Sequence, residues 1–236
     1  FPWSLDHVGN LRGHVADIAD PARRALVAGL FARHEARVLP ALPGLRASVL
    51  HQDANDNNVI VDTAEPARIA GLIDFGDMCF GRTVNELAIT LAYALLDAPD
   101  LYAALRTIIA AYVAEFPLHE PEADVLYDLM RMRLAASVCI SSRQARKHPE
   151  NDYLLISQGP AFTLLERLDR IDPEFMVALC RRAAGFAATK AEAEVRAHLA
   201  ALAPAAVMRP DPAISARMAL PTDGTRPGMP AFSDRA

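Results

Sequence analysis

Hydrophobic positions along the chain recur mostly at helical spacing. Between residues 26 and 38, apolar side chains lie three and four positions apart, the spacing of one helix face. Asp20 and Pro21 precede this run as an N-cap and a first-turn residue, and Pro40 ends it. The same reasoning predicts helices over about 84–96, 101–112, 123–146 and 151–168, and another that begins at Pro173.

Two short β-type runs interrupt the helical pattern. Residues 59–61 and 69–73 are rich in β-branched and apolar side chains, and Pro66 lies between them, which predicts a hairpin. The polar stretch 51–58 is too hydrophilic for regular buried structure. Residues 75–82 are predicted to form a loop. The fold class expected from this order of elements is α+β and mostly helical, with a small β-hairpin.

The helix predicted after that loop has a recognisable start. Thr83 and Glu86 have the spacing of a capping box, in which the two residues cap each other. Residues 87–96 are apolar nearly all round, so we expect this helix to lie at the centre of the core.

The end of the chain has a different composition. From about residue 203 onward the sequence holds six prolines and no hydrophobic period. This pattern predicts a linker or a disordered tail. We therefore expect one domain over residues 1–202 and a Pro-rich tail over residues 203–236.

Composition and charge narrow the classes of function. The chain has 236 residues and a formal charge of -5, which offers nothing to a nucleic-acid backbone. Cys79, Cys139 and Cys180 are far apart, as expected for reduced thiols in a cytoplasmic protein. The most apolar stretch, residues 87–96, is too short to span a bilayer. We expect neither a nucleic-acid nor a membrane partner.

The polar stretch before the hairpin carries the candidate chemistry. His51, Asp53 and Asn58 occupy the H-x-D-x-x-x-x-N pattern of the kinase catalytic loop. Asp74 begins an Asp-Phe-Gly sequence sixteen residues after Asn58, with the predicted hairpin between them. Phosphoryl transfer needs a carboxylate beside the acceptor hydroxyl and hard oxygen ligands for Mg²⁺. The order of loop, hairpin and second Asp matches this requirement.

These stretches resemble the aminoglycoside phosphotransferase, choline kinase and homoserine kinase-like superfamily. Within it, the resemblance is strongest to hydroxylysine kinase-like proteins. The segments that carry it are His51–Val59, Gly71–Met78, Val84–Leu96 and Tyr153–Leu165. The resemblance implies the C-terminal lobe of a protein-kinase-like fold, with ATP as co-substrate and Mg²⁺ as metal. The implied acceptor is the hydroxyl of a small amino alcohol or hydroxy amino acid.

The resemblance also implies roles for single residues. Asp53 and His51 are the expected catalytic residues, Asp53 as the base and His51 as a support of the loop. Asn58 and Asp74 are the expected metal ligands. One predicted helix carries a basic run of Arg131, Arg133, Arg143, Arg146 and Lys147. We interpret this run as a solvated face, with contact to a phosphate or an acidic substrate as the alternative.

The sequence departs from the resembled family in two respects, of which the smaller is Glu86, where the family resemblance leads us to expect Asp. The larger departure concerns the N-terminal lobe. No lysine precedes Lys147, no glycine-rich loop precedes His51, and the chain begins with Phe1 instead of Met. We therefore expect the N-terminal ATP-binding lobe to be missing and the isolated chain to be inactive. The Pro-rich end resembles the segment after the kinase domain of larger fusions, which makes a downstream class-III aminotransferase domain a candidate neighbour.

Two alternatives stay open at this point. In the first alternative, the chain is an inactive remnant or a regulatory module attached to a pyridoxal-phosphate-dependent aminotransferase. In the other alternative it is a metal-dependent hydrolase that uses His51, Asp53 and Asp74 as ligands; such enzymes draw on several histidines, and the next histidine is His119.

Overall fold

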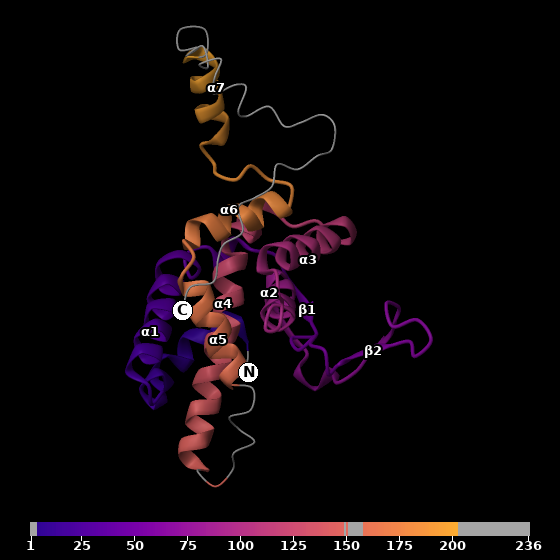
Figure 1. Cartoon of the computed structure of the whole chain (residues 1–236), viewed down its shortest axis with the longest axis vertical. Helices are drawn as coiled ribbons and strands as arrows, with labels where there is room; N and C mark the ends of the chain where they lie inside the picture. Colours follow the sequence, from indigo (N-terminus) through magenta and orange to yellow (C-terminus); the bar gives the residue numbers. More distant parts are fainter. Residues whose placement is uncertain (1–3, 149, 151–157, 203–236) are drawn as a thin grey trace, which may run out of the picture. The chain divides into compact units, whose positions relative to one another are not determined.

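The structure is a computed structural model that describes residues 4–148, 150 and 158–202 (Figure 1). In these residues the α-helices are α1 (Pro21–Arg37), α2 (Val84–Ala94), α3 (Leu101–Glu115), α4 (Glu120–Lys147), α5 (Gln158–Asp169), α6 (Pro173–Ala183) and α7 (Glu192–Leu202). The 3-10 helices are η1 (Leu5–Asp17), η2 (Leu42–Gly44) and η3 (Phe75–Asp77). The strands are β1 (Ala47–Leu50), β2 (Val59–Val61), β3 (Ile69–Leu72) and β4 (Cys79–Arg82). The chain divides after Lys190, and α7 belongs to the second unit.

Aspartate caps determine where helices begin in the first unit. The side chain of Asp20 accepts a hydrogen bond from the Arg23 N–H at 2.8 Å, at the start of α1. Asp100 and Asp172 cap α3 and α6 in the same way. Each cap satisfies N–H groups that the first helical turn leaves without partners. The predicted starts at Pro21 and Pro173 are confirmed.

Helix α4 runs through the middle of the first unit (Figure 1). It packs against η1, α1, α2, α5 and α6. Its buried side chains cover every face of the helix between Ala123 and Cys139, which is possible only for a helix surrounded by others. The predicted central position of α2 is also confirmed, because most of its side chains are buried and it packs along α4.

The strands form two separate antiparallel pairs. The predicted hairpin is confirmed: β2 pairs with β3, Val59 lying opposite Leu72. The hairpin extends away from the helices (Figure 1). The prediction of a loop over residues 75–82 is wrong in part, because Cys79–Arg82 form β4 and pair with β1. That pairing joins segments far apart in sequence, which a local pattern does not reveal.

The capping box predicted at Thr83 and Glu86 is wrong. The Thr83 side chain makes no cap hydrogen bond, and its hydroxyl pairs instead with that of Ser48 on β1 at 3.0 Å. The Glu86 carboxylate accepts a hydrogen bond from the backbone N–H of Gln52 at 3.1 Å. Long-range partners therefore replace the local cap at this helix.

Several predictions lie outside the described residues. They are the Pro-rich tail over 203–236 and the first part of the helix predicted from residue 151. The domain boundary at residue 202 stays a prediction for the same reason. Among the described residues, no helix combines the length and the apolar character needed to cross a membrane.

Candidate functional site

The four predicted site residues lie on two connected segments. His51, Asp53 and Asn58 occupy the loop between β1 and β2, and Asp74 follows β3 directly. The hairpin joins the two segments, because the Ile73 N–H donates a hydrogen bond to the Asn58 carbonyl at 3.0 Å. The residue before Asp74 is thus attached to the end of the loop that holds Asp53.

His51 is fixed by hydrogen bonds from both ring nitrogens. Its Nε2 lies 2.9 Å from the Ile73 carbonyl oxygen, and its Nδ1 accepts a hydrogen bond from the Asp53 N–H at 3.3 Å. This pattern assigns the proton to Nε2. The ring packs edge-on against Phe75 at 5.0 Å between centroids. With both nitrogens engaged by backbone groups, His51 is placed to hold the loop in shape, and no nitrogen is left to take a substrate proton.

The Asp53 carboxylate is held at both oxygens. Asn58 Nδ2 donates to Asp53 Oδ2 at 2.9 Å and to the Asp53 carbonyl at 2.8 Å. Arg133 donates to Oδ1 at 3.1 Å. The side chain nonetheless keeps 22% of its surface exposed, so a molecule from solution can reach it.

The solvated face predicted for the basic run holds for the exposed Arg143, Arg146 and Lys147 but not for Arg133. Its residue is 3% exposed, and Arg131 is 7% exposed. The guanidinium of Arg133 bridges Asp53 and the hydroxyl of Tyr93, at 2.8 Å from the latter. Burial raises the pKa of the Tyr93 phenol above its ordinary value, which keeps it protonated beside the carboxylate. The loop that holds Asp53 is therefore anchored on α4 and α2.

Asp74 adopts a strained backbone conformation. Its φ of 60° lies in the left-handed region, which non-glycine residues rarely adopt. Its Oδ1 accepts a hydrogen bond from the Gly76 N–H at 3.3 Å, and a Cβ at Gly76 would lie 3.2 Å from the same oxygen. Asp74 is exposed at this turn.

The predicted metal ligands, Asn58 and Asp74, are of the residue types that Mg²⁺ prefers. Because Asn58 uses its Nδ2 in both hydrogen bonds to Asp53, the amide oxygen is the atom that could coordinate a cation. A carboxylate at Asp74 supplies a second hard oxygen, and Mg²⁺ commonly takes only one or two protein ligands beside phosphate oxygens. In the part of the chain that the structure describes, no group of three or more His, Cys, Asp or Glu side chains could hold a metal. The hydrolase alternative, with His51, Asp53 and Asp74 as ligands, finds no support there.

A hydrogen bond between Gln52 of the loop and Glu86 of α2 also holds the loop in place. Gln52 has a φ of 72° and is fully buried between His51 and Asp53. Its strained backbone is held by the hydrogen bond from its N–H to the Glu86 carboxylate at 3.1 Å. Glu86 therefore supports the candidate site from the first turn of α2.

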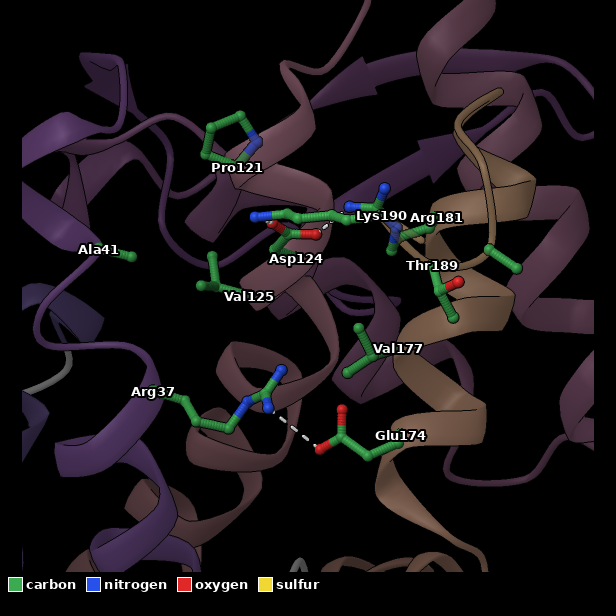
Figure 2. Close-up of a pocket in the computed structure, with 11 residues that line it drawn as sticks. Arg37, Ala41, Pro121, Asp124, Val125, Glu174, Val177, Arg181, Thr189 and Lys190 are labelled. Carbon is green, nitrogen blue, oxygen red and sulfur yellow. Dashed lines mark hydrogen bonds and ion pairs between the residues drawn. The ribbon is translucent and has the colours of Figure 1, made fainter. Parts of the chain in front are cut away.

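Two hollows lie at different distances from this loop. One of about 340 Å³ adjoins it and is lined by β1 residues, His51, Glu86, Tyr112 and Phe116. Figure 2 shows another, of about 540 Å³, between α1, α4 and α6.

The second hollow contains none of the predicted site residues. Its charged side chains pair with one another: Arg37 with Glu174 at 3.1 Å, and Lys190 with Asp124 at 3.1 Å (Figure 2). Arg181 also pairs with Asp124. Because the charged side chains of this hollow are engaged in ion pairs with one another, we place the candidate site at the Asp53 loop.

The cysteines offer no second chemistry. All three are free thiols, and burial raises the pKa of Cys139 and of Cys180 to about 12. Burial also raises the pKa of Cys79. Because the thiolate is the nucleophilic form, these side chains are poor candidates for catalysis.

Comparison with known proteins identifies the class. Residues 1–126, more than half of the chain, match the phosphotransferase enzyme family (APH), and the chain belongs to this family. It is similar to the hydroxylysine kinase of Danio rerio, with 34% identity over 71% of this chain and 48% of the relative. The hydroxylysine kinase of Xenopus laevis is 29% identical over 74% of this chain and 49% of the relative. A homoserine kinase of Pseudomonas aeruginosa is 35% identical over 56% of this chain and 40% of the relative.

The chain spans about half the length of the hydroxylysine kinases it matches. No solved structure matches it significantly.

Sequence reasoning missed two residues of the site. The sequence pattern predicts a surface position for Arg133 and a helix-capping role for Glu86, yet both contact the loop. A signal for Arg133 existed in the sequence: it is flanked by Met130, Met132 and Leu134, so its helix is apolar on that stretch. A charged residue surrounded by apolar positions on a core helix indicates a buried ion pair.

Proposed function

We propose that this chain is the catalytic and acceptor-binding lobe of an ATP- and Mg²⁺-dependent small-molecule kinase. The observation that carries the proposal is the Asp53 carboxylate, held at one oxygen by Asn58 and at the other by Arg133, in a loop tied to Asp74. The proposed lobe is that of a protein-kinase-like fold. The three free thiols fit a cytoplasmic location.

Each site residue has a distinct role in the proposed reaction. Asp53 accepts the proton of the acceptor hydroxyl as that oxygen bonds to the γ-phosphorus and ADP leaves. Asn58 and Asp74 would hold Mg²⁺, which neutralises charge on the phosphate oxygens when bound. His51 positions the loop through its contacts with the backbone of Ile73 and Asp53.

The proposed acceptor is the hydroxyl of a hydroxy amino acid or a small amino alcohol. Support comes from the names of the relatives, hydroxylysine kinase and homoserine kinase. Both names denote amino acids with a side-chain hydroxyl. An acceptor of this size suits a loop whose catalytic carboxylate is only partly exposed.

The ATP-binding residues are proposed to come from a separate N-terminal lobe. No lysine precedes Lys147, so the chain lacks an early lysine that could contact the phosphates. Apolar side chains on the strand pairs are strongly exposed, with Val49 at 64%, Ile69 at 68% and Phe80 at 73%. Exposed apolar surface of this kind is typical of an interface. We expect the 236-residue chain alone to have little or no activity.

The alternative, a regulatory module attached to an aminotransferase, has no specific observation in its favour in residues 4–148, 150 and 158–202. An inactive remnant would have no need to keep the side chains of the site hydrogen-bonded to one another. The kinase proposal is therefore the one to test first.

The test measures ATP-dependent phosphorylation by the full-length protein encoded by the gene. ADP release is followed with 5-hydroxylysine, homoserine, choline and ethanolamine as acceptors, with and without Mg²⁺. We expect Mg²⁺-dependent turnover with one of the hydroxy amino acids. Asp53→Asn should lower kcat by about 10²–10⁴-fold, the usual contribution of a general base. The matched control is Asp56→Asn, an exposed carboxylate in the same loop. Wild-type kcat in Asp53→Asn would overturn the assignment of the base.

A further inference from the structure

A groove on the first unit lies apart from the candidate site and contains a buried arginine. It has a volume of about 370 Å³ and lies between α1 and the turn that joins α5 to α6. Arg131 of α4 lines it and is 7% exposed. The other lining residues are mostly small or apolar: Ala25, Leu26, Gly29, Leu30, Ile171 and Pro173.

Arg131 has no anionic partner among the described residues. Its contacts are a hydrogen bond at the distance limit, 3.5 Å, to the Tyr127 hydroxyl and a position 5.1 Å from the centroid of the Tyr127 ring. Its Nε has no hydrogen-bond partner in the described part of the chain. Asp169 lines the same groove, yet no ion pair joins it to Arg131.

Unlike Arg131, the buried Arg133 and Arg181 of this unit both have anionic partners. Arg133 pairs with Asp53, and Arg181 pairs with Asp124 and Glu120. Burying a guanidinium without an anion is unfavourable, because the group loses water and gains no charge in return.

Asp169, the last residue of α5, lines the same groove, so the C-terminal end of that helix supplies at most a partial negative charge from its backbone there. Helix carbonyls at a C-terminus carry about half a negative charge, spread over several groups. A full negative charge that enters the groove would therefore be attracted to Arg131.

We propose that this groove binds a small monocarboxylate with an apolar tail. A guanidinium offers two parallel N–H donors that match a carboxylate, and the leucine, isoleucine and proline side chains offer an apolar surface for the tail. Phosphate fits less well, because it needs several donors where the groove supplies one cation, and because the carboxylate of Asp169 repels its higher charge more strongly than it repels a monocarboxylate. The proposal is independent of phosphotransfer, since no lining residue belongs to the candidate site.

Gly29 allows the groove to be blocked without touching its charge. A Cβ at Gly29 would have no atom within 4 Å, so Gly29→Ala should leave the groove open. Gly29→Leu should place a branched side chain in the space over Arg131. Both substitutions favour the helix relative to glycine, so neither is expected to unfold α1.

The experiment titrates the purified 236-residue chain with 3-methylbutanoate and follows the Nε–Hε signal of Arg131 by NMR, with calorimetry in parallel. We expect binding with a Kd on the order of 1 mM, as is reasonable for a ligand of this size. The neutral 3-methylbutanamide should bind at least about tenfold more weakly, because it lacks the charge that pairs with the guanidinium.

The variants decide between the proposal and its rivals. Arg131→Met, which replaces the cation by an apolar side chain of similar length, and Gly29→Leu should each abolish binding, whereas Gly29→Ala should bind as the wild type does. Circular dichroism checks that each variant is folded. The proposal is overturned if 3-methylbutanoate does not bind the wild-type chain, if Arg131→Met binds it equally well, or if inorganic phosphate binds more tightly at Arg131.

Discussion

The guanidinium of Arg133 lies 3.1 Å from Asp53 Oδ1, and the two residues are 80 positions apart in the chain. This hydrogen bond connects the loop after β1 to the middle of α4, the helix that packs against η1, α1, α2, α5 and α6. The same nitrogen of Arg133 donates to the Tyr93 hydroxyl, so three elements meet at one group. Because Asn58 occupies the other carboxylate oxygen, Asp53 is held in a single orientation. A general base must be positioned before its basicity matters.

Substitution of Arg133 should affect both stability and turnover. Arg133→Met removes the bonds to Asp53 and Tyr93 and leaves their polar atoms without this partner. We expect a loss of about 1–3 kcal/mol in the free energy of unfolding, measured with urea. In the active full-length protein, kcat should fall by about tenfold or more, because Asp53 loses its fixed orientation. Arg133→Lys should recover part of the stability, since it keeps the charge but not the planar fork.

The control for this prediction is Arg146→Met. Arg146 lies on the same helix and its side chain is 74% exposed, paired with Asp17. Exposed pairs contribute little, so its stability should change by less than about 1 kcal/mol and kcat should not change. A fall in kcat as large as that of Arg133→Met would contradict a specific role for Arg133.

Substitution of His51 should loosen the loop and the turn that carries Asp74. His51→Phe keeps the ring and its edge-on contact with Phe75, but it removes the hydrogen bonds to Ile73 and Asp53. We expect a loss of about 1–3 kcal/mol in the free energy of unfolding. In the active protein, kcat should fall and the KM for MgATP should rise together. An unchanged acidic limb of the pH–rate profile would agree with a positioning role.

The control for His51 is the exposed His7→Phe. If His51→Phe alone abolished activity but left the urea midpoint and the KM for MgATP unchanged, His51 would act as a base and the positioning role would be wrong.

Much of the helical framework could be predicted from the sequence. Asp20 with Pro21 and Asp172 with Pro173 give local signals whose physical cause, capping of free N–H groups, needs no tertiary contact. The hairpin was predictable for the same reason, because its two strands are close in sequence. The loop order His51, Asp53, Asn58 and then Asp74 is likewise a local pattern.

What failed depended on contacts between distant segments. Strand β4 forms because it pairs with β1. The Thr83 hydroxyl forms a hydrogen bond with that of Ser48 on β1 instead of capping its own helix. Arg133 was interpreted from its charge, but its position is determined by Asp53 and Tyr93. Local propensity cannot reveal a partner that lies tens of residues away.

Glu86 should stabilise the loop through its carboxylate oxygen. Glu86→Leu removes the acceptor for the Gln52 N–H. Gln52 has a left-handed φ of 72°, so its backbone depends on this hydrogen bond. We expect a loss of about 1–2 kcal/mol in the free energy of unfolding. The matched variant Glu86→Gln keeps an acceptor oxygen and should lose less than half as much. Faster hydrogen exchange at the Gln52 amide in Glu86→Leu would report the same loss locally; equal stability of the two variants would contradict this role.

His34 should make the stability of the chain depend on pH. It is 1% exposed on α1, and neither ring nitrogen has a hydrogen-bond partner in the described residues. Burial lowers the pKa of His34 below its ordinary value of 6.5, although Asp128 and Glu35 act in the opposite direction. Between the lowered pKa and 6.5 the unfolded state binds the proton more readily than the folded state. Stability should therefore be complete above that range and fall as the pH drops through it.

His34→Leu should remove this dependence on pH. Urea unfolding of the wild type at intervals between pH 5 and 7.5 should show stability rising with pH, with a slope of at most about 1.4 kcal/mol per pH unit from one group. His34→Leu should flatten the slope in that window, because an apolar side chain at the same buried position has no proton to bind. The exposed His7→Leu, as control, should keep the wild-type slope. If His34→Leu kept it as well, the dependence would arise from another group, and the lowered pKa of His34 would not be what limits the fold in acid.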